Sequence, residues 1–419
     1  MVKKFILNDF NKNVIKLMTG STIAQAIPVA ASPILTRIYS PEQFGVLALF
    51  VAITSIFSAI VNGRYEFAIM LPDKDEDAVN ILALSLLIAL SVSTLLFLVI
   101  LLFQDFILSI LGNNEIKPWL FFIPLVVLMS GIYNALNFMN TRIGSYGVIA
   151  KANVIKAVVG TTFQIILGLL KAGILGLIGG QIISHFVSNY RMVKEVIRDK
   201  TLLNSISKSK IKRMAFKYKR FPLVSSWATL CNVVSVHSTS IFLSMIYSAS
   251  TLGFYSLINK VLNLPMIVVS RTISQVFFQQ ASVEKRENGK AIKTFKSTFI
   301  KLLIISLLGF GPLFFFIEDL VIILFGEQWA DAGKYAQFLI PLMLIKFVVS
   351  PLTSTLIIYE KQVIDLYWQV VYLLLSIGIF GISYILGFSI YYFFIFNTLV
   401  LSIHYLIILF IAYRLVRST

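Results

Sequence analysis

The sequence predicts an all-α polytopic membrane protein with about twelve transmembrane helices. Hydrophobic residues make up 58% of its 419 residues and charged residues only 13%, whereas a soluble domain carries about 25% charged residues. Its mean hydropathy is +0.87. Long apolar runs such as ILALSLLIALSVSTLLFLVILLF at 81–103 show none of the alternation typical of membrane β-strands. The spanning elements are therefore expected to be helices.

About 20 helical residues cross the roughly 30 Å hydrocarbon layer of a bilayer, and about twelve apolar stretches approach or exceed that length. They are approximately 14–36, 44–63, 80–103, 118–139, 147–169, 173–190, 222–246, 252–275, 298–324, 336–358, 364–386 and 390–413. An even number of spans places both termini on the same side of the membrane.

The distribution of lysine and arginine predicts which side that is, because basic flanks are retained in the cytoplasm. If both termini are cytoplasmic, the inner loops and flanks hold 29 of the 36 basic residues and the outer connections hold four. Those four are Arg37, Lys117, Lys171 and Lys334. We therefore expect both termini to lie in the cytoplasm.

Two charge clusters lie in the predicted cytoplasmic connections. Eleven basic residues fall within 191–220, between the sixth and seventh spans. Two effects explain these basic residues: the preference of lysine and arginine for cytoplasmic loops and their attraction to anionic lipid headgroups, about 1 kcal/mol per residue. The net charge of +17 therefore does not require a nucleic acid partner. A docking site for a cytoplasmic partner is the alternative. The acidic stretch DKDED at 73–77 is expected to be a solvated turn, because it lacks the glycine and distal glutamate of a calcium loop.

A short motif occurs once in each half of the chain. IYSPEQFG at 38–45 is echoed by IYSASTLG at 246–253. Six predicted spans separate the two copies, so the halves have the same orientation, as in transporters built from parallel repeats. We expect an N-terminal six-helix lobe at 1–195, a basic cytoplasmic linker at 196–220 and a C-terminal six-helix lobe at 221–419. The substrate path would then lie between the lobes.

The stretches PILTRIYSPEQFGVLALF (33–50) and GRYEFAIMLP (63–72) resemble the Wzx-type flippases of bacterial polysaccharide export. That family belongs to the multidrug/oligosaccharidyl-lipid/polysaccharide (MOP) exporter superfamily. The resemblance implies a MATE/MOP-like pair of bundles in the bacterial cytoplasmic (inner) membrane. The implied activity moves an undecaprenyl-pyrophosphate-linked oligosaccharide, such as an O-antigen or capsule repeat unit, from the cytoplasmic to the periplasmic leaflet by alternating access.

The partners that this resemblance implies are a polyprenyl-pyrophosphate-linked glycan and membrane lipids, with other polysaccharide-assembly proteins as optional partners and no nucleic acid. No cofactor is expected, and coupling to an ion or proton is left open. His237 and His404 are solitary, without the neighbouring ligands that a metal site requires.

Three lysines lie well inside predicted spans, away from the span ends, namely Lys156, Lys260 and Lys346. A charge at mid-bilayer costs about 2.5–3.5 kcal/mol on insertion scales, so these side chains should face a wet cavity or a partner. Polar residues flank them at helical spacing, such as Asn259 and Asn263 beside Lys260. An anionic pyrophosphate would bind to such cations. Snorkelling to the membrane surface is the alternative, above all for Lys156.

Further candidates lie at span ends and on polar helix faces. Arg64 and Glu66 match the family's Arg-x-Glu pattern, so Arg64 is expected at the cytoplasmic mouth, with a boundary ion pair as the alternative. Arg271 at the inner end of the eighth span is a candidate in the opposite lobe. Polar residues on several spans are expected to line an aqueous interior, although small polar residues also join helices. Among them are Gln25, Asn62 and Asn137.

Three other functions are weighed against this one. A drug or cation antiporter of the same superfamily would use intramembrane carboxylates, whereas the candidates here are lysines. A membrane enzyme acting on lipid-linked sugars would need catalytic residues in a large outer loop, and the longest outer connection, 104–117, has no His or Arg. A flippase of another polyprenyl-linked precursor stays open. The sequence therefore favours a transporter over an enzyme.

Overall fold

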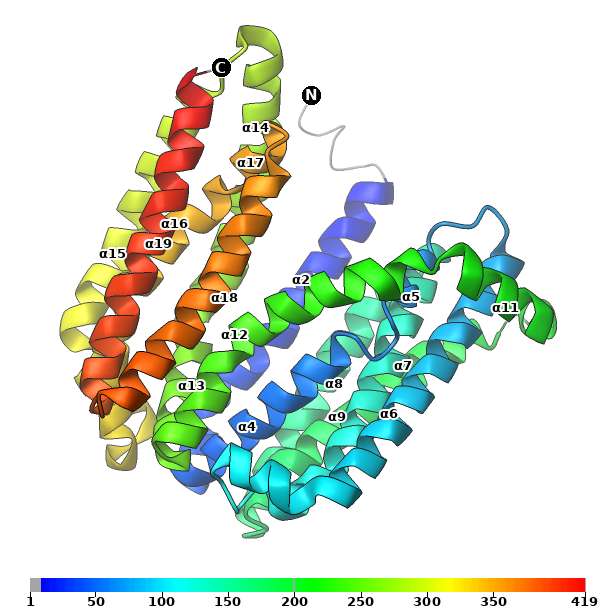
Figure 1. Cartoon of the computed structure of the whole chain (residues 1–419), viewed down its shortest axis with the longest axis horizontal. Coiled ribbons are helices and arrows are strands. Elements are labelled where there is room, and N and C mark those ends of the chain that lie inside the picture. The colour runs from blue at the N-terminus through cyan, green and yellow to red at the C-terminus, as the bar shows by residue number, and fades with distance from the viewer. Residues whose placement is uncertain (1–8, 199, 419) are drawn as a thin grey trace. The chain divides into compact units, whose positions relative to one another are not determined.

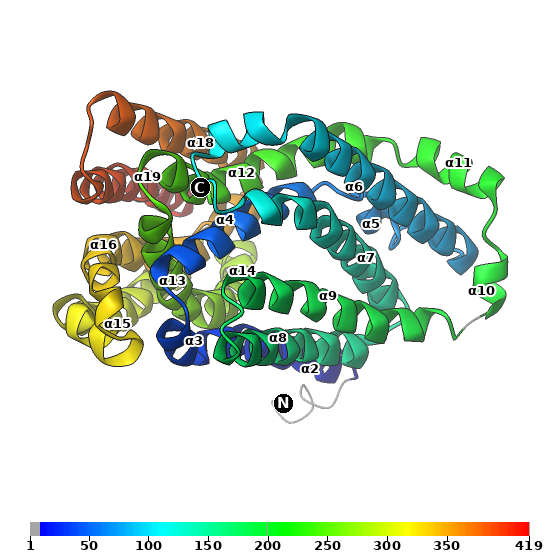
Figure 2. The same ribbon diagram turned by 90° about the horizontal axis from the view of Figure 1, so that it is seen from below.

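The computed structural model describes residues 9–198 and 200–418, and every regular element within them is helical. Nine helical segments of this part of the chain are long and apolar enough to cross a membrane (Figures 1 and 2). They are α4 (Pro41–Ser58), α6 (Asp75–Leu111), η1 with α7 (Lys117–Arg142), α8 (Tyr146–Leu169), η2 with α12 (Phe221–Ile246), α15 (Ile292–Phe325), η4 with α16 and α17 (Glu327–Ile358), α18 (Gln362–Ile385) and α19 (Ile390–Ser418). The prediction of an all-helical, multi-pass membrane protein is confirmed.

The other three predicted spans correspond to α2 (Asp9–Ala30), α9 (Ile174–Val196) and α13 (Ala249–Pro265). Helices α2 and α9 are long enough, but many Gly, Ser, Thr, Asn and Gln residues lower their hydropathy. Helix α13 has only 17 residues and ends at Pro265, because proline removes a backbone donor and clashes with the preceding turn. A π-helical turn (Met266–Ser270) then leads into α14 (Arg271–Asn288). The number of twelve spans therefore stays a prediction.

The chain divides into two compact units, Met1–Leu252 and Gly253–Thr419, called here the N-terminal and C-terminal units. The N-terminal unit contains α12, which packs against α4. Helix α16 (Ala330–Leu352) is central to the C-terminal unit and packs against both α15 and α19. The two six-helix lobes and the cytoplasmic position of the termini stay predictions.

A buried asparagine joins three elements of the N-terminal unit. Asn62, in the turn after α4, is 1% exposed. Its Nδ2 donates to the backbone oxygens of Ser85 in α6 and Gly131 in α7, at 3.1 Å each. Buried polar groups require such partners. The sequence left two interpretations open for Asn62, an aqueous interior and a contact between helices, and the structure shows the second.

The two copies of the IYS motif form the same local structure. In the first copy, Ser40 caps α4 in a capping box: its Oγ accepts from the backbone N–H of Gln43, and the Gln43 side chain accepts from the Ser40 N–H. In the second copy, Ser248 Oγ accepts from the backbone N–H of Thr251 at 3.1 Å, at the start of α13. A serine at this position satisfies a donor that the first helical turn leaves unpaired. The shared motif is a junction that ends one helix and starts the next.

The two junctions also touch each other within the N-terminal unit. The Ser250 hydroxyl donates to the carboxylate of Glu42, and these two residues occupy equivalent positions of the two copies. Gly45 lies so close to Ala249 that a Cβ added to Gly45 would stand 2.6 Å from the Ala249 carbonyl carbon. Glycine permits this approach because it has no side chain.

Candidate functional site

Lys346 lies in α16 and is enclosed by aromatic side chains of α18 and α19. Its Nζ is 5.3 Å from the ring centroid of Tyr405 and 5.9 Å from that of Tyr372. The face of an aromatic ring attracts a cation, more strongly when both are removed from water. Beside these rings, His404 stacks on Trp368 with 4.9 Å between ring centroids. Two buried ring nitrogens, His404 Nε2 and Trp368 Nε1, have no hydrogen-bond partner among the described residues.

Lys156 lies in α8 and points to a histidine of α9. Its Nζ is 3.3 Å from Nδ1 of His185 and 5.0 Å from the ring centroid of Tyr133 in α7. The Tyr133 hydroxyl donates to the side-chain oxygen of Asn153, one turn before the lysine in α8. The snorkelling alternative is therefore wrong for Lys156, whose ammonium group is held among side chains of three helices.

Neither Lys156 nor Lys346 has a carboxylate within ion-pair distance among the residues that the structure describes. Each lysine lies in a helix of membrane-crossing length. A cation in such a place needs polar or anionic neighbours, and the protein supplies rings, an imidazole and hydroxyl groups instead of a counter-charge. Both positions are therefore suited to an external anion.

Helix α13 carries the third intramembrane lysine and two candidate asparagines. Asn263 Nδ2 donates to the backbone and side-chain oxygens of Asn259, at 2.6 and 2.7 Å. Lys260 is partly exposed. Arg271 opens α14, and its side chain lies outside the described residues. The binding roles of these four residues stay predictions.

Arg64 lies before the short helix α5 (Tyr65–Ala68) in a left-handed conformation with φ of 61°. Its Nη1 is 3.6 Å from the Glu66 carboxylate, and its guanidinium lies 4.0 Å above the ring of Phe67. Glu66 is 3% exposed. Burial raises the pKa of its carboxyl, and a backbone hydrogen bond and the Arg64 charge offset only part of that rise. The ion pair considered as the alternative for Arg64 is present, and its role at a substrate mouth stays a prediction.

The remaining candidates, Gln25 and Asn137, lie on other helices of the N-terminal unit. Gln25 Nε2 donates to the Ser21 carbonyl, one turn earlier in α2, at 3.2 Å. Asn137 is partly exposed on α7. The polar contacts of the described residues do not join these two side chains to Lys156. They are therefore scattered positions, and nothing beyond their polarity supports a shared site.

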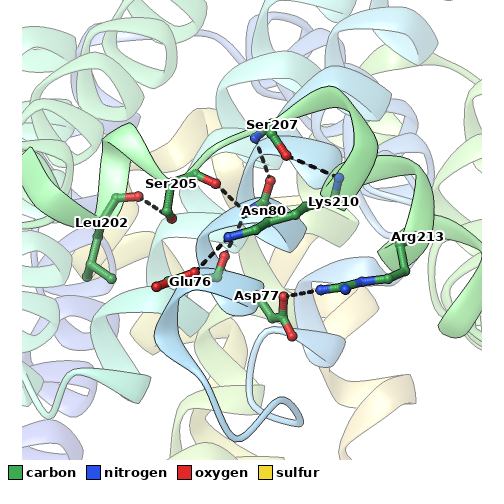
Figure 3. A network of polar contacts seen from close by, with 8 residues as sticks. All are labelled: Glu76, Asp77, Asn80, Leu202, Ser205, Ser207, Lys210 and Arg213. Carbon is green, nitrogen blue, oxygen red and sulfur yellow. Dashed lines mark hydrogen bonds and ion pairs between the residues drawn. The ribbon is translucent and has the colours of Figure 1, made fainter.

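The connection predicted as a basic linker folds onto the start of α6, as Figure 3 shows. It contains two short helices, α10 (Lys200–Asn204) and α11 (Lys208–Lys217). Lys210 pairs with Glu76 at 2.7 Å, and Arg213 pairs with Asp77 at 2.8 Å. Glu76 is exposed, as the prediction of a solvated stretch requires, but Glu76 and Asp77 lie in the first turn of α6 and not in a turn between helices. We call this arrangement of α11 on α6 the linker clamp.

Buried groups hold the linker clamp in addition to its exposed charges. Asn80 is fully buried in α6, and its side chain donates to the Ser205 carbonyl at 3.1 Å and accepts from the Ser207 N–H at 3.0 Å. The hydroxyl of Tyr65 donates to the Ala215 carbonyl at 2.8 Å, and Met214 is 1% exposed. The side-chain amide of Asn80 thus bonds to one backbone carbonyl and one backbone N–H of the turn between α10 and α11.

Residues 34–334 match the family described as "Polysaccharide biosynthesis protein". The chain belongs to that family. It is also 24% identical over 347 residues to the succinoglycan biosynthesis transport protein ExoT of Rhizobium meliloti (strain 1021). That alignment covers 79% of this chain and 65% of ExoT, so the chain spans slightly less than two thirds of the relative's length.

Solved structures show that the fold is that of MATE-like transporters. An inward-facing multidrug resistance MATE family transporter of the MOP superfamily has a TM-score of 0.68 and 14% identity, with 94% of both chains covered. The lipid II flippase MurJ in an inward closed conformation has a TM-score of 0.64 and 12% identity, with 96% of this chain and 99% of MurJ covered. These relatives are a transport protein, a transporter and a flippase, in agreement with the prediction of a transporter and not an enzyme.

Two features of the site were missed by reasoning from the sequence. His185 lies on a polar face of α9 with Gln181, Ser188 and Asn189 at helical spacing, and that periodicity could have identified it. The opposite charges of two stretches, the acidic 73–77 and the basic 208–213, could have indicated the linker clamp. Charge complementarity alone does not show which residues pair, because 134 residues separate Glu76 from Lys210.

Proposed function

We propose that this protein is a flippase for an undecaprenyl-pyrophosphate-linked oligosaccharide in the bacterial cytoplasmic membrane. It moves an O-antigen or capsule repeat unit from the cytoplasmic to the periplasmic leaflet by alternating access between two lobes. Membership of the polysaccharide biosynthesis family supports the substrate class. The observation that carries the proposal is the pair of membrane-helix lysines, Lys156 and Lys346, that have no carboxylate partner among the described residues.

An anionic pyrophosphate supplies the counter-charge that these lysines lack. Lysine binds phosphate as a point charge through its three donors. Around Lys346, the rings of Tyr372, Tyr405 and Trp368 add apolar faces and polar edges, which suit the alternating CH and OH groups of a sugar. A cationic drug would be repelled by the same lysines, so the antiporter alternative is less favoured. A flippase of another polyprenyl-linked precursor would use the same chemistry.

The test is surface polysaccharide display in a host that lacks this gene. The host is complemented with wild type, Lys346→Met, Lys156→Met or Lys334→Met at matched membrane levels. Lys334 is an exposed lysine that pairs with Asp331 and serves as the control. The proposal expects the gene to restore surface glycan, and the two candidate variants to leave lipid-linked repeat units in the inner leaflet. Normal surface glycan in the deletion host, with redundant flippases removed, would refute it.

A further inference from the structure

We propose that Lys156 and His185 form a proton-linked anion site in the N-terminal unit: the pair takes up a proton when a small dianion, such as a phosphate group, binds between α8 and α9. The inference rests on the proposed function only for the identity of the anion. The site itself follows from the contact between two basic side chains.

The geometry limits the pair to one positive charge in the empty protein. At 3.3 Å, Lys156 Nζ and His185 Nδ1 are at hydrogen-bond distance. A lysine ammonium has only donors, so Nδ1 must accept, and the imidazole proton must then sit on Nε2. If both groups were charged, two donors would face each other and two like charges would repel with little water between them. The contact therefore favours one shared proton.

Among the described residues, the surroundings provide no counter-ion that would permit two charges. His185 is 8% exposed. Helix α9 packs against α8, α7 and α4, and α8 also packs against α2 and α3, where Lys16 and Arg37 are exposed. The charged and titratable groups of those helices are accounted for by contacts elsewhere or by position. In α4, Glu42 accepts a hydrogen bond from Ser250, and in α7, Arg142 pairs with Asp75 and Tyr133 lies against Lys156. In α8, Lys151 is exposed and Tyr146 lies in the first turn. The charged and titratable residues of α9 follow His185 by at least five residues and are Tyr190, Arg191, Lys194 and Glu195.

A bound dianion changes this balance. It offers an acceptor to the Lys156 ammonium, which no longer needs Nδ1, and it attracts a proton to the imidazole. Both side chains then donate to the anion, as Lys and protonated His do to phosphate oxygens. Lys156 is partly exposed, which leaves an approach for a small anion. Anion binding at this site is therefore coupled to the uptake of one proton, and anion release to its loss.

The experiment measures sulfate binding to the purified full-length protein in detergent at pH 6, 7 and 8. Sulfate is chosen because it stays a dianion over this range, and chloride keeps the ionic strength constant. The affinity is obtained from the rise in melting temperature with sulfate concentration. The same series on Lys156→Met corrects for the general stabilisation of proteins by sulfate.

One linked proton makes the sulfate affinity of wild type fall by up to about tenfold per pH unit. His185→Asn and His185→Gln keep Lys156 and are expected to bind sulfate with little dependence on pH. Lys151→Met removes an exposed lysine five residues away in the same helix and is expected to behave as wild type.

A sulfate affinity of wild type that does not change with pH would overturn the inference, as would an unchanged pH dependence in both histidine variants. Gel filtration of each variant confirms that it is folded, and the two histidine substitutions provide a second variant if one fails. No lipid-linked glycan enters this measurement. A failure here therefore leaves the flippase proposal standing, and a failure of the complementation test leaves this site standing.

Discussion

Replacing Gly45 with alanine should destabilise the protein, although the same change in most helices stabilises it. Gly45 lies within α4, where alanine is ordinarily favoured by about 0.5–1 kcal/mol over glycine. A Cβ at this position would stand 2.6 Å from the Ala249 carbonyl carbon and closer still to its oxygen. The obstacle is main chain at the start of α13, so no side-chain rotation relieves it. One of the two helices must move.

The size of the effect follows from two opposing terms. Insertion of a methyl group into a packed contact costs typically about 1–3 kcal/mol, and the intrinsic gain of alanine offsets less than 1 kcal/mol of this. We therefore expect a net loss of about 1–2 kcal/mol. For domains of 150–250 residues, about 2–4 °C of melting temperature corresponds to 1 kcal/mol. The measurement is the melting temperature of detergent-purified protein, which should fall by several degrees.

The matched control is Gly378→Ala in α18, where an added Cβ meets nothing within 4 Å. This variant should be as stable as wild type or slightly more stable. The double variant Gly45→Ala with Ala249→Gly should not recover stability, because the obstruction comes from the Ala249 backbone and not from its methyl group. A Gly45→Ala protein that melts at or above the wild-type temperature would show that the two junctions are not in close contact.

Three further outcomes are expected. Asn62→Leu removes two buried hydrogen bonds and should lower the free energy of unfolding by about 1–3 kcal/mol. The control is Asn137→Leu, since the side chain of Asn137 is partly exposed, and the Asn62 variant should have the lower melting temperature of the two. Glu66→Gln should stabilise the protein increasingly as pH rises above 4.5, because burial raises the pKa of the folded carboxyl above that reference value, and ionisation therefore destabilises the fold. A difference in melting temperature between variant and wild type that is the same at pH 4 and at pH 8 would contradict this. Lys210→Glu breaks the ion pair with Glu76 and should speed tryptic cleavage of the linker. Adding Glu76→Lys to the same chain restores a pair of opposite charges and should slow the cleavage again. Because the Lys210–Glu76 pair is solvent-exposed, the free energy of unfolding should change by no more than about 1 kcal/mol.

Hydropathy predicted the class of fold because a bilayer restricts a chain to helices of a fixed length. The long apolar helices α6 and α15 were predicted on that ground alone. The same measure was weakest for α13, where Pro265 and a π-helical turn interrupt the span. Boundaries also shifted: the run predicted at 80–103 is part of a helix that extends from Asp75 to Leu111 with non-helical angles at Phe103.

The candidate site was predictable in its cations but not in their partners. An isolated lysine in an apolar run is visible in the sequence, as Lys156 and Lys346 were. Which side chain each one contacts depends on helix packing: His185 follows Lys156 by 29 residues, and the rings around Lys346 come from two other helices. Two interpretations of Asn62 stayed open because hydropathy cannot distinguish a polar residue that faces water from one that bonds to a neighbouring helix.

The linker clamp has a consequence for how the chain is made. Glu76 leaves the ribosome 134 residues before its partner Lys210, which at about 5–20 residues per second is roughly 7 to 27 s. Throughout that interval the acidic first turn of α6 has no basic partner from the linker. Its charges are favoured by the helix dipole and, once α7 is made, by the pairing of Arg142 with Asp75. The later helices of the N-terminal unit, α7, α8 and α9, are synthesised in the meantime. The clamp closes only when the end of this stretch emerges, so nascent chains arrested before residue 205 should leave Asn80 without its two backbone partners and the start of α6 open to modification.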